Sequence, residues 1–229
     1  MPSEQTKLSV HAVIFDMDGT LIDSIDIYFK IVEIALERLE LPQVSRKQIL
    51  DASETGDFSW ELVLPDEVHH KKDEIIGEAW EIINEIAPQM FQDNLELIRG
   101  ADNILQSISS GSPKIGMVTS TQRKYLKIKM LPLQLAGVEE LFEVIITSDD
   151  VPNRKPDPDP LIECARRLDV NPNKCVYVGD TRTDIKAGKA AGMKTVAVLT
   201  GFDDYDMLAN ESPDAIIDSI RNLVEVIEV

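Results

Sequence analysis

Residues 10–20, VHAVIFDMDGT, join an apolar run to two carboxylates that are separated by a single residue. The run Val10–Phe15 is continuous rather than alternating, which predicts a strand buried on both faces of a parallel sheet. In an extended chain residues i and i+2 point to the same side, so Asp16 and Asp18 would leave the strand end together. Such a pair needs a compensating cation or proton, and the oxygen-seeking Mg²⁺ suits it. Taken alone, the motif is also compatible with a turn that caps the next helix.

Four further short apolar runs end beside polar or glycine-containing turns. They are Lys114–Val118, Val144–Thr147, Cys175–Val178 and Thr195–Leu199. Segments with helical periodicity lie between them, at Ala101–Ser110, Asp159–Leu168 and Thr183–Ala191. This alternation predicts an α/β fold with a Rossmann-like parallel sheet and right-handed crossovers. In sheets of this kind the reactive residues collect at the carboxyl ends of the strands.

The stretch from residue 24 to residue 98 interrupts the alternation, because it holds no convincing strand. Ile27, Ile31 and Ala35 belong to one helical stripe, and Glu67–Ala87 forms a longer one that Pro88 should close. The stretch has 17 acidic and 6 basic residues, so it carries 11 of the 18 net negative charges. We therefore expect a catalytic core of residues 1–23 and 99–229, with an all-helical domain, residues 24–98, inserted after the first strand.

Two of the later strand ends carry polar candidates. Thr119 and Ser120 follow Lys114–Val118, where hydroxyls and backbone N–H groups can hold a phosphate oxygen. The alternative for these residues is a helix N-cap. Lys155 lies in RKPDPDP, residues 154–160, whose alternating prolines stiffen the loop and hold the lysine in place. The alternative for Lys155 is a solvated surface lysine.

The last motif is GDTRTD, residues 179–184, which directly follows Cys175–Val178. Asp180 is at the strand end, and Asp184 lies one turn into the next helix on nearly the same side. Acidic residues also favour helix N-termini for electrostatic reasons, which is the alternative explanation. Four strand ends together nevertheless bring carboxylates, a hydroxyl, a lysine and further carboxylates to one edge, which indicates phosphate chemistry.

Composition narrows the class of protein. The net charge of −18 disfavours binding to nucleic acid or to anionic membranes, which depends on neutralising phosphates with Lys and Arg. No stretch approaches the roughly 20 apolar residues of a membrane span, and the start, MPSEQTKL, is not a secretory signal. The chain has only two cysteines, Cys164 and Cys175, so we do not expect a disulfide framework. We expect a cytoplasmic protein.

At this point the sequence resembles the haloacid dehalogenase superfamily of phosphohydrolases. Residues 15–24, FDMDGTLIDS, match the first motif of that superfamily, and Val118-Thr119-Ser120 fits the second. Residues 154–158 fit the third motif, and residues 179–193 fit the fourth, with Thr181 where serine is frequent. The helical insertion is similar to the C1-type cap of the subgroup that contains phosphoglycolate phosphatase and β-phosphoglucomutase.

The resemblance implies a role for each matched residue. Asp16 would attack phosphorus to form an aspartyl-phosphate, and Asp18 would protonate the leaving oxygen and then activate water. Thr119 and Lys155 would hold and neutralise the phosphoryl group, with Gly19, Thr20 and Ser120 as further phosphate contacts. Mg²⁺ would be held by Asp16, the backbone carbonyl of Asp18, Asp180 and Asp184. Eight basic residues follow strand ends and would offset the acidic charge there, several of them on exposed helix faces: Arg123, Lys124, Lys127, Lys129, Arg154, Lys155, Arg182 and Lys186.

The substrate is not contained in these motifs. The candidate specificity segment is Asp51–Leu64, with Trp60 as the candidate substrate contact; a solvated loop with Trp60 packed beneath it is the alternative. We expect a Mg²⁺-dependent phosphomonoesterase that acts on a small phosphate ester as a monomer or a homodimer. A phosphomutase or a phosphonatase of the same superfamily is the alternative enzyme, and a phosphonatase would need a lysine in the inserted domain.

Non-enzymatic alternatives fit the sequence less well. A signalling receiver also combines an aspartate, a hydroxyl and a lysine on a parallel sheet, but it lacks the long insertion and the second acid after the nucleophile. A silent phosphate-binding protein would not need competent residues at all four motif positions.

Overall fold

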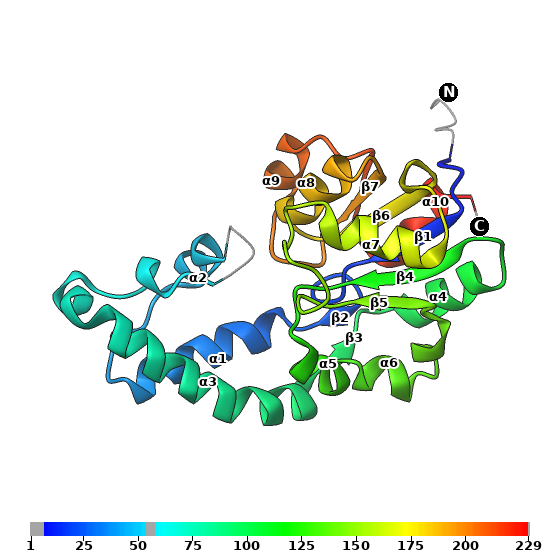
Figure 1. Cartoon of the computed structure of the whole chain (residues 1–229). Coiled ribbons are helices and arrows are strands. Elements are labelled where there is room, and N and C mark those ends of the chain that lie inside the picture. Colours follow the sequence, from blue (N-terminus) through cyan, green and yellow to red (C-terminus); the bar gives the residue numbers. More distant parts are fainter. Residues whose placement is uncertain (1–6, 54–57, 229) are drawn as a thin grey trace. The chain divides into compact units, whose positions relative to one another are not determined.

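The computed structural model describes residues 7–53 and 58–228, and the chain divides into two compact units (Figure 1). One unit comprises residues 1–23 and 96–229, and the other comprises residues 24–95. The second boundary lies after Leu95, three residues before the expected position, because β3 (Glu96–Leu97) pairs antiparallel with β2 (Ile22–Asp23). In the part of the chain that the structure describes, no helix combines the length and the apolar character needed to cross a membrane.

The first unit is built on a six-stranded sheet whose neighbouring strands are all parallel. Its strands, in spatial order, are β5 (Val144–Ile146), β4 (Lys114–Val118), β1 (Ala12–Phe15), β6 (Cys175–Gly179), β7 (Lys194–Val198) and β8 (Ala215–Ile217). The α/β fold class and the five predicted strands are confirmed. Strand β8 was missed, because three residues at the edge of a sheet are too few to establish a pattern.

Helices lie between these strands and after the last of them. They are α4 (Ala101–Ser109), α5 (Arg123–Lys129), α6 (Leu131–Leu135), α7 (Asp159–Leu168), α8 (Arg182–Ala190), α9 (Tyr205–Asn210) and α10 (Leu223–Val226), with short 3₁₀ helices at Glu139–Leu141, Pro172–Lys174 and Ile220–Asn222. The predicted bounds of α4, α7 and α8 agree with the structure to within one residue. Pro132 lies in the first turn of α6, where a missing N–H costs nothing.

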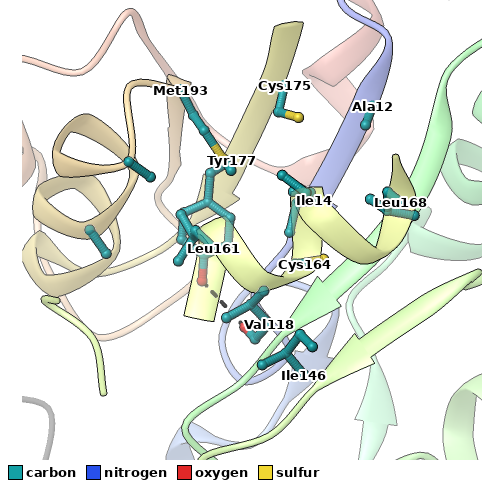
Figure 2. Close-up of a cluster of buried hydrophobic side chains, with 13 residues drawn as sticks. Ala12, Ile14, Val118, Ile146, Leu161, Cys164, Leu168, Cys175, Tyr177 and Met193 are labelled. Atoms are coloured by element: carbon teal, nitrogen blue, oxygen red, sulfur yellow. Dashed lines mark hydrogen bonds between the residues drawn. The ribbon is translucent and has the colours of Figure 1, made fainter. Parts of the chain in front are cut away.

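The core of the sheet is made by alternate residues of its central strands. Ile14 of β1 and Tyr177 of β6 are fully buried and belong to one apolar cluster with residues of α7 and α8 (Figure 2). The tyrosine hydroxyl reaches toward the carboxyl end of β4, where its oxygen lies 3.3 Å from the carbonyl oxygen of Val118. The residues between them, such as Val13 and Val176, are also fully buried, which is why these strands read as continuous apolar runs.

The register of the sheet places the carboxyl ends of β1, β4 and β6 at the same level. Phe15 of β1 is level with Met117 of β4 and with Val178 of β6. Strand β1 also lies at the point where the order of the strands reverses, because the chain adds β4 and β5 on one side of it and then β6 to β8 on the other. The crevice at such a switch point is where open α/β sheets bind their ligands.

The second unit is helical. It contains α1 (Ile25–Arg38), α2 (Arg46–Ala52), the 3₁₀ helices Trp60–Leu62 and Asp66–Lys71, and α3 (Lys72–Asn94). The prediction that Pro88 ends the long helix is wrong, since α3 continues through it to Asn94. Phe91, beyond the proline, is buried and stacks edge-on against Tyr28 of α1, with ring centroids 5.9 Å apart. This packing outweighs the one hydrogen bond that the proline removes.

Candidate active site

Asp16 and Lys155 form an ion pair at the end of β1. Asp16 directly follows Phe15, and its backbone N–H donates to the carbonyl of Val178 at 2.8 Å, which continues the ladder to β6 by one residue. Lys155 Nζ donates to Asp16 Oδ1 at 2.7 Å, and both side chains are about nine-tenths buried or more. The lysine is therefore not the solvated surface residue that a single lysine usually is.

Lys155 has two further partners, so all three of its N–H groups have an acceptor. Its Nζ donates to Asp184 Oδ1 at 2.7 Å and to the hydroxyl oxygen of Tyr177 at 3.0 Å. Burial works to lower the pKa of Lys155, but the carboxylates of Asp16 and Asp184 outweigh it and raise the pKa well above its ordinary value. The ammonium is thus a fixed positive charge beside the candidate nucleophile.

Asp184 and Asp180 come from the fourth motif and lie in the same place. Asp184 Oδ2 accepts from the backbone N–H and hydroxyl of Thr181 in a capping box that starts α8. Asp180, which is fully buried, accepts from the backbone N–H of Phe202 at 2.9 Å and from the Thr20 hydroxyl at 3.2 Å. Asp184 therefore caps a helix and belongs to the carboxylate group at once, so the two explanations of this motif are compatible.

Three carboxylates lie close together at this edge of the sheet, and the positive charge of Lys155 alone does not balance them. One oxygen each of Asp16, Asp180 and Asp184 lie within 4.8 Å of one another, and all three residues are buried. Burial raises the pKa of Asp16 to about 7 against the opposing effect of Lys155. Burial and the charges of Asp184 and Asp16 raise the pKa of Asp180 well above its usual range. For Asp184, Lys155 and the bonds from Thr181 outweigh burial, so its pKa is lowered.

This donor set fits a hard divalent cation. Three ionised carboxylates with one lysine ammonium carry a net charge of about −2, which a cation of charge +2 would neutralise. The backbone is shaped around the group as well, because Gly19 has a φ of +73° and a Cβ there would lie 2.4 Å from Asp180 Oδ2. Only glycine tolerates that close approach and that backbone conformation.

Asp18 has a different environment from Asp16. Its Oδ2 accepts from Lys129 Nζ at 2.5 Å and from the Thr121 hydroxyl at 3.1 Å. Its Oδ1 is buried and has no hydrogen-bond partner among the described residues. The structure thus separates the two carboxylates of the DxD motif: Asp16 faces Lys155, and Asp18 faces Lys129.

The residues predicted to contact phosphate differ in burial and in their hydrogen-bond partners. Thr119 is buried, and its Oγ1 accepts from the backbone N–H of Thr121 at 3.1 Å, which leaves its own hydrogen available to donate. It is not the N-cap of α5, which begins after Gln122. Ser120 is exposed. The Thr20 hydroxyl is directed at Asp180 and supports that carboxylate.

Trp60 lies in the core of the helical unit. It is 2% exposed and stacks edge-on between Phe58 and Trp80, with ring centroids 5.0 and 6.4 Å away. Its position corresponds to the alternative in which Trp60 packs beneath the loop. Residues 54–57 of the candidate specificity segment Asp51–Leu64 lie outside the described residues.

Sequence reasoning missed the part that two side chains play at this site: Lys129 and Tyr177. Lys129 was counted among basic residues of which several line exposed faces, yet it is 1% exposed. A signal was present, because Lys129 is spaced three residues from Leu126 and four from Leu133, on the apolar stripe of that segment. Tyr177 was treated only as part of an apolar strand, and its hydroxyl contacts are visible only in the folded chain.

Comparison with known proteins found a matching family and several similar phosphatases. The family described as haloacid dehalogenase-like hydrolase matches residues 13–198. The phosphoglycolate phosphatase of Salmonella typhi is 28% identical over 234 residues, which cover 94% of this chain and 92% of that protein. The phosphoglycolate phosphatase of Escherichia coli K12 is also 28% identical, over 94% of this chain and 91% of its own length.

Solved structures agree on the fold. A predicted phosphoglycolate phosphatase from Haemophilus somnus 129PT superposes with a TM-score of 0.83 at 19% identity, covering 95% of this chain and 98% of that one. A hydrolase from Deinococcus radiodurans R1, whose crystal contains bound phosphate and sodium, has a TM-score of 0.73 at 24% identity and covers 94% of each chain. The match to the family spans most of the sheet together with Asp16, Thr119, Lys155, Asp180 and Asp184, and the chain therefore belongs to the haloacid dehalogenase-like hydrolases.

Proposed function

We propose that this phosphatase of the haloacid dehalogenase superfamily is a Mg²⁺-dependent phosphomonoesterase that hydrolyses a small phosphorylated metabolite through an aspartyl-phosphate. The observation that carries the proposal is the contact of Asp16 Oδ1 with Lys155 Nζ at 2.7 Å, next to a buried carboxylate group and at the end of the central strand. A carboxylate nucleophile divides hydrolysis into two displacements, each of which is easier than the direct attack of water.

In the first displacement Asp16 attacks phosphorus, and the bond from phosphorus to the ester oxygen breaks. Lys155 offsets negative charge on Asp16 and on the phosphoryl oxygens, and the Thr119 hydroxyl donates to one of those oxygens. Asp18 gives its proton to the leaving oxygen. In the second displacement Asp18 takes a proton from water, which attacks phosphorus and releases Asp16 and inorganic phosphate.

Asp16, the backbone carbonyl of Asp18, Asp180 and Asp184 would hold Mg²⁺. The buried group of three carboxylates with one lysine supports this assignment, because its net negative charge needs a cation. The bound ion supplies positive charge that offsets the charge of the transferring phosphoryl group.

The helical unit, residues 24–95, is proposed to act as a cap that selects the substrate. This proposal rests on the resemblance of the insertion to the C1-type cap, and the relatives named phosphoglycolate phosphatase support a small phosphate ester as the substrate. The cap sequence offers no Arg or Lys between Asp51 and Val68, so we propose a substrate with little charge beyond its one phosphate. Trp60 is assigned to the core of this unit, since its indole is buried among Phe58 and Trp80.

A phosphonatase is less well supported. It would need a lysine of the helical unit to form an imine. Of the four lysines there, Lys30, Lys47 and Lys72 each pair with a carboxylate, and Lys71 is exposed. A cytoplasmic location is proposed from the two cysteines, which are both free and buried.

The test is turnover of p-nitrophenyl phosphate and of a panel of alkyl phosphates, namely 2-phosphoglycolate, the glycerol phosphates and sugar monophosphates. We expect activity with Mg²⁺ that EDTA abolishes, together with a mass increase of one phosphoryl group on wild-type protein quenched in acid. Asp16→Asn should abolish both signals, whereas Asp218→Asn, at an exposed aspartate, should change neither. Turnover that survives in Asp16→Asn would refute the assigned nucleophile, and absence of any Mg²⁺-dependent turnover would refute the function.

A further inference from the structure

Lys129 is a buried lysine at the end of α5 that the reaction described above does not use. It is 1% exposed, which places it among the most buried large side chains of the protein. Lysine is almost never fully buried without a partner, because its charge loses hydration there. Its Nζ lies 2.5 Å from Asp18 Oδ2 and 2.9 Å from the Thr121 hydroxyl oxygen.

The two oxygens of Asp18 are consequently unequal. Oδ2 accepts hydrogen bonds from the Lys129 ammonium and the Thr121 hydroxyl, while Oδ1 is buried with no hydrogen-bond partner among the described residues. Two donors on one oxygen restrict rotation of the carboxyl group, and they leave the other oxygen without a protein donor among the described residues. A group that gives a proton to a leaving oxygen and later takes one from water needs this arrangement, because both transfers require a short and directed contact.

Direct action of Lys129 on a substrate is not supported by its position. Its side chain is 2% exposed, and its ammonium contacts Asp18 Oδ2 and the Thr121 hydroxyl. The positive charge beside the nucleophile comes from Lys155, which pairs with Asp16 and Asp184. The contact through which Lys129 can influence phosphoryl transfer is the one with the carboxylate of Asp18.

We propose that Lys129 is a positioning residue that anchors Oδ2 of Asp18 and so presents Oδ1 for proton transfer, an inference that rests on the phosphomonoesterase function proposed above. When Asp18 protonates the leaving oxygen, the P–O bond electrons go to that oxygen and Asp18 becomes a carboxylate. In the second displacement Asp18 recovers a proton from the attacking water. Lys129 exchanges no proton in either step.

The test uses leaving groups that differ in their need for a proton. The p-nitrophenolate ion leaves without protonation, whereas an alkoxide needs a proton from Asp18. We compare kcat/KM of wild type and Lys129→Met for p-nitrophenyl phosphate and for the alkyl phosphate that wild type hydrolyses fastest. The expected loss is on the order of 100-fold or more for the alkyl ester and less than about 10-fold for the aryl ester. Lys127→Met, an exposed lysine of the same helix, is the matched control and should leave both values unchanged.

A second comparison separates positioning from a purely structural role. In an Asp18→Asn background, Lys129→Met should cause little further loss with either ester, because residues that act as a unit are not additive. Equal losses of the two esters in the single variant, or additive losses in the double variant, would overturn the proposal.

Two further observations keep the result interpretable. If Lys129→Met does not fold, as judged by circular dichroism, Thr121→Val removes the other donor to Oδ2 and should show the same preference for the aryl ester in a weaker form; equal losses there would overturn the proposal. Wild-type protein without any phosphomonoesterase activity would instead refute the function and not the anchoring of Asp18.

Discussion

The buried carboxylates at the strand ends should make the protein less stable as the pH rises when no divalent cation is present. Burial raises the pKa of Asp16 from 3.8 to about 7, so the folded protein binds this proton more tightly than the unfolded chain does. A raised pKa contributes stability that is fully present below 3.8 and is lost as the pH rises through about 7. Asp180, whose pKa is also raised, changes stability in the same direction.

The magnitude follows from the size of the shift. About three pKa units correspond to about 4 kcal/mol over the whole range, of which about 2.5 kcal/mol is lost between pH 5 and pH 8. Asp184, whose pKa is lowered, affects stability only below its ordinary value of 3.8 and so lies outside this window. The asparagine side chain of Asp16→Asn is uncharged at every pH, so this variant should lack the part of the pH-dependent stability that Asp16 contributes. The loss between pH 5 and pH 8 should then be smaller by about 2.5 kcal/mol.

Urea unfolding in EDTA at the two pH values measures this loss. Far-ultraviolet circular dichroism is the suitable probe, because both tryptophans, Trp60 and Trp80, lie in the helical unit. A loss of about 2.5 kcal/mol should move the urea midpoint by about 1 M. Saturating Mg²⁺ should restore stability more at pH 8 than at pH 5, since it binds the ionised carboxylates. The same pH dependence in wild type, Asp16→Asn and the exposed-site control Asp218→Asn would refute the reasoning.

Two other changes test contacts of single residues. Tyr177→Phe removes an acceptor from Lys155 and a donor to Asp184. We expect the free energy of unfolding measured with urea to fall by about 1.5–3 kcal/mol, and kcat to be lower. Unchanged stability and kcat would show that the hydroxyl is dispensable. Pro88→Ala restores a backbone N–H inside α3 and should stabilise the helical unit by about 1–3 kcal/mol, measured by tryptophan fluorescence; a destabilised variant would contradict this.

Local pattern was sufficient for five of the six strands of the sheet and for the group of three carboxylates. Each strand ends at a motif, and parallel strands carry their carboxyl ends to one edge, so the meeting of Asp16, Asp180 and Asp184 follows from order along the chain. The family was also evident from these motifs, because their residues and spacing are specific. Strand β8 and the pair β2 and β3 are too short to leave such a pattern.

Other features depend on partners that are remote in the sequence. Pro88 predicted a helix end, but the packing of Phe91 on Tyr28 carries α3 onward, and such packing is invisible to a local rule. Trp60 was a candidate for substrate contact, and its burial is set by Phe58 and by Trp80 of another helix.

The sequence by itself determined the α/β fold, the family, and the candidate nucleophile Asp16 with Lys155 as its counter-charge. Only the tertiary structure decided which other lysine is buried. Lys129 meets Asp18 across 111 positions of sequence, and Tyr177 meets Lys155 across 22. The physical reason is that backbone preference and strand order are written in neighbouring residues, whereas the burial of a charge depends on what the whole fold brings beside it.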